Sequence, residues 1–151
     1  MNPERLPDVN EFRHHCDLQI RFSDVDVLGH VNNTVYMTFY DTGKAHYFSD
    51  ILGKRIDWKH VECVIANVDC AFLAPIFFGE DIEVLTRCEY IGEKSFRLLQ
   101  VIREKGSGIL KSACETVMVS FDAESGKAME LPSEWRKALE RDGFPEAGLR
   151  N

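Results

Sequence analysis

Two aspartates, Asp24 and Asp26, stand a few residues before the start of a predicted helix. Asn32 or Asn33 is a suitable N-cap for this helix, because its side-chain oxygen can accept hydrogen bonds from amides of the first turn. The free N–H groups at a helix N-terminus carry about half a positive charge. Such amides can stabilise an oxyanion while a nearby carboxylate attacks a carbonyl carbon or activates a water. The arrangement favours acyl transfer, and Gly29 would let a ligand approach the backbone closely.

The helix is predicted over residues 34–52, with Gly53 as its C-cap. Apolar residues cover most of its circumference rather than one stripe, so we expect protein to surround it. Gly43 lies in its middle, where glycine costs about 1 kcal/mol relative to alanine. That cost is tolerable if another backbone packs closely against Gly43.

The rest of the chain is typical of strands. Alternation of apolar and polar residues predicts a strand over 18–22 before the helix. Four long strands in a meander are predicted after it, over 63–78, 82–90, 96–103 and 109–121, with a hairpin turn at 106–108 and a short helix over 134–140. This order predicts an α+β fold, in which one antiparallel sheet curls around the long helix. The outer face and the edge strands would need cover, so we expect a homo-oligomer formed by edge pairing or by stacking of sheets.

Composition narrows the class of protein. The 151 residues, 44% hydrophobic and 28% charged, predict one domain over 1–151. The formal net charge of −7 argues against a nucleic-acid partner and against an anionic membrane surface. Five widely spaced cysteines without a C-x-x-C pair favour a reducing, cytoplasmic location, and no apolar run is long enough for membrane insertion. We expect no metal, because the remaining histidines lack ligand spacing: His14, His15, His46 and His60.

The stretch between the aspartates and the helix carries a specific signature, Asp26-x-x-Gly29-His30-Val31-Asn32-Asn33-x-x-Tyr36. With it the sequence resembles the hotdog-fold thioesterases, in particular the 4-hydroxybenzoyl-CoA thioesterase and acyl-CoA thioesterase family. The resemblance covers about residues 17–139, with further matches at Phe72-Leu73-x-Pro75, Gly79-Glu80-Asp81 and Ile91-Gly92-x-x-Ser95. It implies a sheet wrapped around a central helix, and homodimers or homotetramers with active sites at subunit interfaces.

The resemblance also implies roles for single residues. Asp26 would be the catalytic carboxylate, as nucleophile or general base, whereas Asp24 matches a structural position. A backbone amide near Asn33 would polarise the thioester carbonyl, with Gly29 and Tyr36 on the same substrate-binding side. His30 is a second catalytic candidate, because acyl carrier thioesterases of this fold carry an Asp and a His at this spacing. They also carry an Asn where this chain has Leu28, so a relay through that residue is absent; an ordering role for His30 stays open.

Lys94 and Ser95 match a place where relatives contact the nucleotide of coenzyme A. Gly92 and Glu93 replace the basic neighbours found there. Other cations on the predicted strands are expected on solvated faces: Arg97, Arg103 and Lys111.

The resemblance therefore implies hydrolysis of an acyl-CoA thioester to the free acid and coenzyme A, without a cofactor beyond the substrate's own coenzyme A. An acyl carrier protein thioesterase and a non-catalytic acyl-CoA-binding protein stay open as alternatives. A hotdog hydratase is disfavoured, since its Asp-x-Asn-Pro-x-His pattern is absent. An α/β-hydrolase is excluded, because no G-x-S-x-G elbow occurs.

Overall fold

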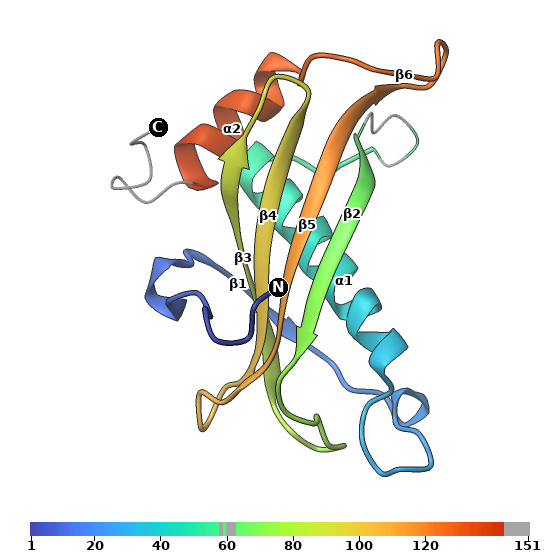
Figure 1. Ribbon diagram of the computed structural model, residues 1–151, viewed down its shortest axis with the longest axis vertical. Helices are drawn as coiled ribbons and strands as arrows, with labels where there is room; N and C mark the ends of the chain where they lie inside the picture. The colour runs from blue at the N-terminus through green and yellow to red at the C-terminus, as the bar shows by residue number, and fades with distance from the viewer. Residues whose placement is uncertain (58, 60–62, 144–151) are drawn as a thin grey trace.

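The computed structural model describes residues 1–57, 59 and 63–143 (Figure 1). His60 and the end of the predicted domain, 144–151, lie outside these residues. The strands are β1 (His14–Leu18), β2 (Cys63–Phe72), β3 (Ile82–Ile91), β4 (Ser95–Glu104), β5 (Leu110–Asp122) and β6 (Lys127–Ala128). The helices are α1 (Asn33–Leu52), α2 (Ser133–Gly143) and two short 3-10 turns, Val9–Glu11 and Phe22–Asp24. The α+β class, a curled antiparallel sheet with one long helix and a short C-terminal helix, is confirmed.

Capping residues set both ends of α1, as the sequence predicted. Asn32 is the N-cap, and its side-chain oxygen accepts a hydrogen bond from the Thr34 amide at 2.9 Å. Gly53 ends the helix with a φ of 65°, a left-handed conformation that favours glycine. Among the described residues, none of the helices is long and apolar enough to cross a membrane.

Helix α1 packs across one face of the sheet (Figure 1). The close approach expected at Gly43 is present, but side chains of the sheet make it rather than a backbone. A Cβ at this position would lie 2.7 Å from Val84 Cγ1 and 3.0 Å from Gln100 Nε2. The expectation that protein surrounds the helix is wrong for the single chain, because Thr38 and Asp41 on its far side are exposed.

The strand order is β1-β3-β4-β5-β2, so the predicted four-strand meander is wrong for β2. Strands β3, β4 and β5 follow one another through short turns, whereas β2 pairs with β5 at the edge of the sheet. The segment 73–81 between β2 and β3 is longer than a hairpin loop, and it carries the chain from one side of the sheet to the other. Local turn signals cannot distinguish such a crossover from a hairpin.

Two strand boundaries also differ from the prediction. Strand β1 covers His14–Leu18 instead of 18–22, because His14 takes an inward position that the sequence suggests for an apolar residue. Its ring packs edge-on against Tyr47, with centroids 5.4 Å apart, and its Nε2 lies 2.7 Å from Asp50 Oδ2. Strand β2 ends at Phe72 instead of 78, just before the segment that contains Pro75.

The N-terminal segment covers the sheet face that points away from α1 (Figure 1). Phe12 is 5% exposed and packs in one cluster with Leu85, Leu99 and Val101. The Arg87 guanidinium lies over the Phe12 ring, 5.4 Å from its centroid. This cover leaves little apolar surface for a second sheet, so it disfavours oligomerisation by stacking of sheets.

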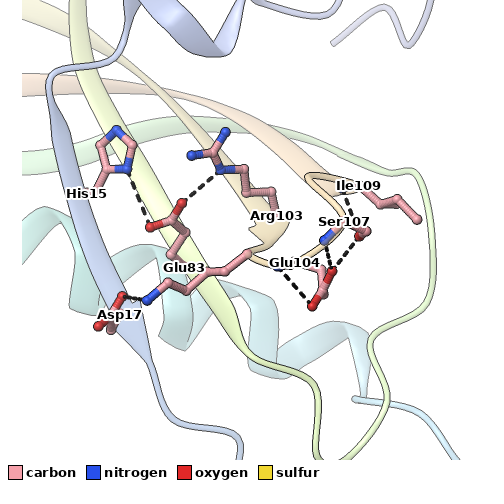
Figure 2. A network of polar contacts seen from close by, with 9 residues as sticks. His15, Asp17, Glu83, Arg103, Glu104, Ser107 and Ile109 are labelled. Atoms are coloured by element: carbon pink, nitrogen blue, oxygen red, sulfur yellow. Dashed lines mark hydrogen bonds and ion pairs between the residues drawn. The ribbon is translucent and has the colours of Figure 1, made fainter.

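Charged contacts occupy the border of that outer face (Figure 2). Glu83 is buried, accepts a hydrogen bond from Arg103 Nε at 2.8 Å and lies 3.4 Å from His15 Nδ1. Lys105 pairs with Asp17 at 3.0 Å. These contacts place charge where a stacked sheet would need apolar surface, and they leave the edge of the sheet as the expected route to an oligomer.

Phe12→Ala should therefore destabilise the protein by about 3 kcal/mol, because it removes a buried aromatic ring and leaves a cavity. Urea unfolding followed by circular dichroism measures the change in unfolding free energy. Phe22→Ala is the matched control, since Phe22 is 85% exposed and its loss should change stability by less than about 0.5 kcal/mol. Equal effects of the two variants would contradict the covering role of the N-terminal segment.

Candidate active site at the start of helix α1

The loop before α1 is a tight turn that places Asp26 beside the helix start. Val25 and Val31 form an antiparallel bridge, and the Asp26 amide donates to the His30 carbonyl at 3.1 Å. The Gly29 amide donates back to the Asp26 carbonyl at 3.0 Å, which closes the turn. Gly29 has a φ of 85°, a conformation that L side chains rarely adopt. Its role in this chain is therefore to form the turn.

The Asp26 carboxylate lies beside the N-cap of α1. Its Oδ1 accepts a hydrogen bond from the Leu28 amide at 2.9 Å, and its Oδ2 accepts one from the Asn32 side-chain amide at 3.4 Å. Asn32 is the N-cap, so these contacts tie the carboxylate to the positive end of α1. The side chain is half-buried, which leaves it accessible to a small molecule.

Asp24 has contacts of a different kind. It is 2% exposed, and its carboxylate accepts from the Arg21 backbone amide at 2.8 Å and from Arg21 Nη2 at 3.0 Å. Its carbonyl accepts from the Asn32 amide at 2.9 Å. The contacts with Arg21 close the 3-10 turn, and the Asn32 amide holds this loop against the helix start, which fits the structural role expected for Asp24.

A pocket of about 240 Å³ opens at the start of α1. It brings together three of the predicted residues, His30, Asn33 and Tyr36. Asp26 and Gly29 are not among its lining residues, and lie on the neighbouring turn. The opposite wall comes from the segment after β2: Phe72, Leu73, Ala74 and Pro75.

Asn33 and Tyr36 take different positions in this pocket. Asn33 is the first residue of α1, so its amide has no acceptor within the helix. Tyr36 is buried, with its ring edge-on to Phe72 at a centroid distance of 5.1 Å and its hydroxyl 3.5 Å from the Ala74 carbonyl. Burial raises the pKa of Tyr36 to about 12, so the phenol remains a hydrogen-bond donor at neutral pH. Tyr36 thus forms a wall, and Asn33 offers an amide.

His30 joins the turn to the opposite wall. It forms an antiparallel bridge with Phe77, and the adjacent Val31 amide donates to the Ile76 carbonyl at 2.8 Å. Its ring lines the pocket and is half-buried. This placement is compatible with either role that the sequence left open for His30.

Sequence reasoning missed the ion pair that holds the pocket wall. Lys111 is buried, and its Nζ donates to the Pro75 carbonyl at 2.9 Å and to Glu80 Oε1 at 3.0 Å. The expectation that Lys111 lies on a solvated strand face is wrong, because the crossing segment covers it. The available signals were a lysine at the start of a predicted strand and a glutamate in the glycine turn at 79–81.

Lys94 and Ser95 lie far from the pocket within one chain. Ser95 pairs with Val119 of β5, whereas Phe72 of the pocket pairs with Ser112 of the same strand. Val119 and Ser112 are seven residues apart on β5, which corresponds to about 23 Å along the strand. The structure therefore does not bring the predicted coenzyme A contacts to the pocket of the same chain. In the described part of the chain, no group of three or more His, Cys, Asp or Glu side chains could hold a metal ion.

A curled antiparallel sheet packed on a long helix, with a carboxylate at the helix start, defines the hotdog class of thioesterase fold. Residues 20–139 match the family model described as the thioesterase-like superfamily, and the chain belongs to this superfamily.

Named relatives agree with this assignment. The chain is 23% identical over 127 residues to the long-chain acyl-CoA thioesterase FadM of Escherichia coli, covering 82% of this chain and 95% of FadM. It is 26% identical over 125 residues to the uncharacterized protein YsmA of Bacillus subtilis, covering 81% and 82%. A Thermus thermophilus thioesterase, solved in complex with coenzyme A and zinc, superposes with a TM-score of 0.79 at 27% identity, covering 91% and 99%.

Glu80→Ala should destabilise the protein by about 2–3 kcal/mol, because it leaves the buried Lys111 ammonium without its carboxylate. The matched control is Glu134→Ala, since Glu134 pairs with Lys54 at an exposed site and its loss should cost less than about 1 kcal/mol. Urea unfolding of both variants measures the difference. A cost for Glu80→Ala no larger than that of the control would show that the ion pair does not hold the pocket wall.

Proposed function

We propose that this protein hydrolyses acyl-CoA thioesters to the free acid and coenzyme A. The observation that carries the proposal is the Asp26 carboxylate at the N-terminus of α1, next to a pocket lined by Asn33. Membership of the thioesterase-like superfamily supports it. The acyl-CoA thioesterase among the relatives and the coenzyme A bound to the Thermus structure support the choice of carrier.

The proposed reaction uses the charge of the helix terminus. The thioester carbonyl oxygen would accept from the Asn33 amide, where the helix dipole stabilises the negative charge of the tetrahedral intermediate. Asp26 would attack the carbonyl carbon as a nucleophile, or take a proton from the attacking water as a general base. The carbon–sulfur bond then breaks, and the leaving thiolate needs no strong acid because its thiol has a pKa of about 8.5. In the nucleophilic route, water then hydrolyses the anhydride formed on Asp26 and releases the free acid. His30 would order the substrate or the loop from the pocket wall.

The walls of the pocket favour an apolar group at its floor. Phe72, Leu73 and Pro75 present carbon atoms to the space, and the ring of Tyr36 closes it. An acyl chain or aromatic acyl group can exclude water from these surfaces, whereas the charged nucleotide of coenzyme A requires solvent or cations. We therefore place the acyl group in the pocket and the nucleotide outside it.

A second copy of the chain would complete the site. The open edge of β2 exposes Val64 and Val68 and leaves backbone groups for pairing. If two copies pair antiparallel through β2, the Cys63 end of one strand lies beside the Phe72 end of the other. Since Cys63 lies at the same end of the sheet as Ser95, Lys94 of the second copy would approach the pocket. We infer a homodimer in which each nucleotide contacts the other chain.

Asp26→Asn should lower kcat by at least about a hundredfold, because the amide neither attacks the carbonyl nor takes a proton. Steady-state hydrolysis of an acyl-CoA measured by thiol release tests this, with circular dichroism to check the fold. A rate within about threefold of the unchanged protein would refute the role of Asp26.

Two other aspartates serve as controls. Asp24→Asn should lower stability through the lost contacts with Arg21 but keep kcat per folded molecule. Asp41→Asn tests the carboxylate on the exposed side of α1 and should keep kcat.

Hydrolysis rates for the same acyl group on coenzyme A and on acyl carrier protein distinguish the two carriers. Binding without turnover on either carrier would favour a non-catalytic acyl-CoA-binding protein.

Mixed dimers of Asp26→Asn and Lys94→Ala should recover activity at low substrate concentration. Each parent lacks either the carboxylate or the cation in both sites, whereas a mixed dimer has one intact site. Random pairing gives intact sites in about a quarter of the total, whereas the isolated mixed dimer has half of its sites intact, so its kcat/KM should approach half of the original value. Coexpression with two affinity tags isolates the mixed dimer. Activity no higher than that of Lys94→Ala alone would place both residues in one chain's site or exclude Lys94.

A further inference from the structure

Two cysteines face each other across the edge of the sheet. Cys70 of β2 and Cys114 of β5 are directly opposed in the antiparallel register. The Cα atoms of such a pair are about 4.5–5.5 Å apart and their side chains lie on the same face. This separation falls within the range that a disulfide bridges. Both thiols are reduced, with Cys114 fully buried and Cys70 half-buried at the open edge.

Hydroxyl groups surround the half-buried thiol. Cys70 Sγ lies 3.4 Å from Ser112 Oγ, which accepts a hydrogen bond from the Tyr40 hydroxyl at 2.7 Å. The Ser112 hydroxyl donates its own proton to the Ala71 carbonyl at 2.9 Å. Tyr40 is buried on α1, and burial holds the pKa of its phenol well above the ordinary value. Tyr40 therefore keeps its proton and donates it to Ser112, the hydroxyl in contact with the sulfur.

The pKa values of the two thiols are shifted in opposite directions. The hydrogen bond from Cys114 lowers the pKa of Cys70 to about 7, and that same contact together with burial raises the pKa of Cys114. The buried Lys44 ammonium, which pairs with Asp41 at 3.1 Å, also acts on Cys114 and favours negative charge there. Asp69 is the neighbouring charge that opposes the Cys70 thiolate. Cys70 is therefore the more acidic, half-buried thiol of the pair, and Cys114 is the less acidic, buried thiol behind it.

We propose that Cys70 and Cys114 form a peroxide-reactive dithiol site, in which Cys70 is oxidised first and Cys114 closes a reversible disulfide between β2 and β5. Cys70 stands two residues before Phe72 of the pocket wall, but its oxidation requires neither Asp26 nor a bound acyl group. Its ligand class is a small hydroperoxide, which can reach the half-buried sulfur while the edge of β2 is unpaired; in the inferred homodimer that edge is paired, so the reactive form is the single chain.

The chemistry balances with hydrogen peroxide as the oxidant. The Cys70 thiolate attacks one peroxide oxygen, the oxygen–oxygen bond breaks, and the released hydroxide takes up a proton to form water. Cys114 then attacks the sulfenic sulfur of Cys70 and gives up its proton, and a second water leaves. Two thiols and one peroxide become one disulfide and two waters. A dithiol reductant reverses the reaction by exchange.

Treatment of the reduced, full-length protein with hydrogen peroxide tests the proposal. We expect an intact mass lower by two hydrogen atoms, a Cys70–Cys114 cross-link in tryptic digests, and recovery of both thiols after reduction. Cys63 shares the tryptic segment between Lys59 and Arg87 with Cys70, so Cys63→Ser makes the assignment unique. If Cys70 gains oxygen while Cys114 still alkylates after denaturation, the disulfide is refuted.

Cys16 provides the matched comparison, because it is also half-buried but sits on β1, where burial raises its pKa. Iodoacetamide should alkylate Cys70 at least about tenfold faster than Cys16 at neutral pH, with a half-maximal rate near pH 7 for Cys70 and a higher midpoint for Cys16. Cys16→Ser should keep the cross-link, and Cys114→Ser should leave a sulfenic acid on Cys70 that dimedone traps. Equal alkylation rates would overturn the proposal even if Cys114→Ser fails to fold.

Discussion

The contact between Gly43 and the sheet is the constraint on which the rest of the structure depends. Any side chain at this position would collide with Val84, so glycine sets how closely α1 approaches β3 and β4. At that distance Gln100 of β4 donates to the Tyr40 carbonyl at 3.1 Å, and the Tyr40 hydroxyl reaches Ser112 of β5. Tyr36, one turn earlier, then closes the pocket. The helix start is therefore positioned from the middle of the helix as well as from its own loop.

Local chemistry made the helix and its loop predictable. Asn32 and Gly53 carry capping signals that act within a few residues, and both ends of α1 followed from them. The distinction between Asp24 and Asp26 rested on the signature, and the buried contacts of Asp24 agree with it. Asn33 and Tyr36 reached the same pocket because helical spacing puts residues three apart on one side.

The features of the fold that the sequence did not predict depend on contacts between residues far apart in the chain. Strand β2 pairs with β5 instead of β3, and nothing in its own sequence encodes that choice. The pocket wall after Phe72 and the ion pair between Lys111 and Glu80 follow from this crossover, because it brings the 73–80 segment over β5. His14 is a different case. The prediction did not include this titratable residue in a strand, but it takes an inward position because its ring contacts Tyr47 and Asp50. The sequence pattern shows that a residue is polar, but it does not show which distant residue will form its hydrogen bond or ion pair.

The same crossover determines how the proposed dimer would be built. It places β2 at the border of the sheet, where Val64 and Val68 stay exposed, while Phe12 covers the centre of the outer face. The outer face therefore has little exposed apolar surface for stacking, whereas the unpaired strand β2 has exposed apolar side chains. A two-fold axis between the two copies of that strand pairs them antiparallel, which is the operation needed to bring Lys94 of one copy to the pocket of the other. In the meander order predicted from the sequence, β2 would have paired with β3, and β5 would have been a border strand.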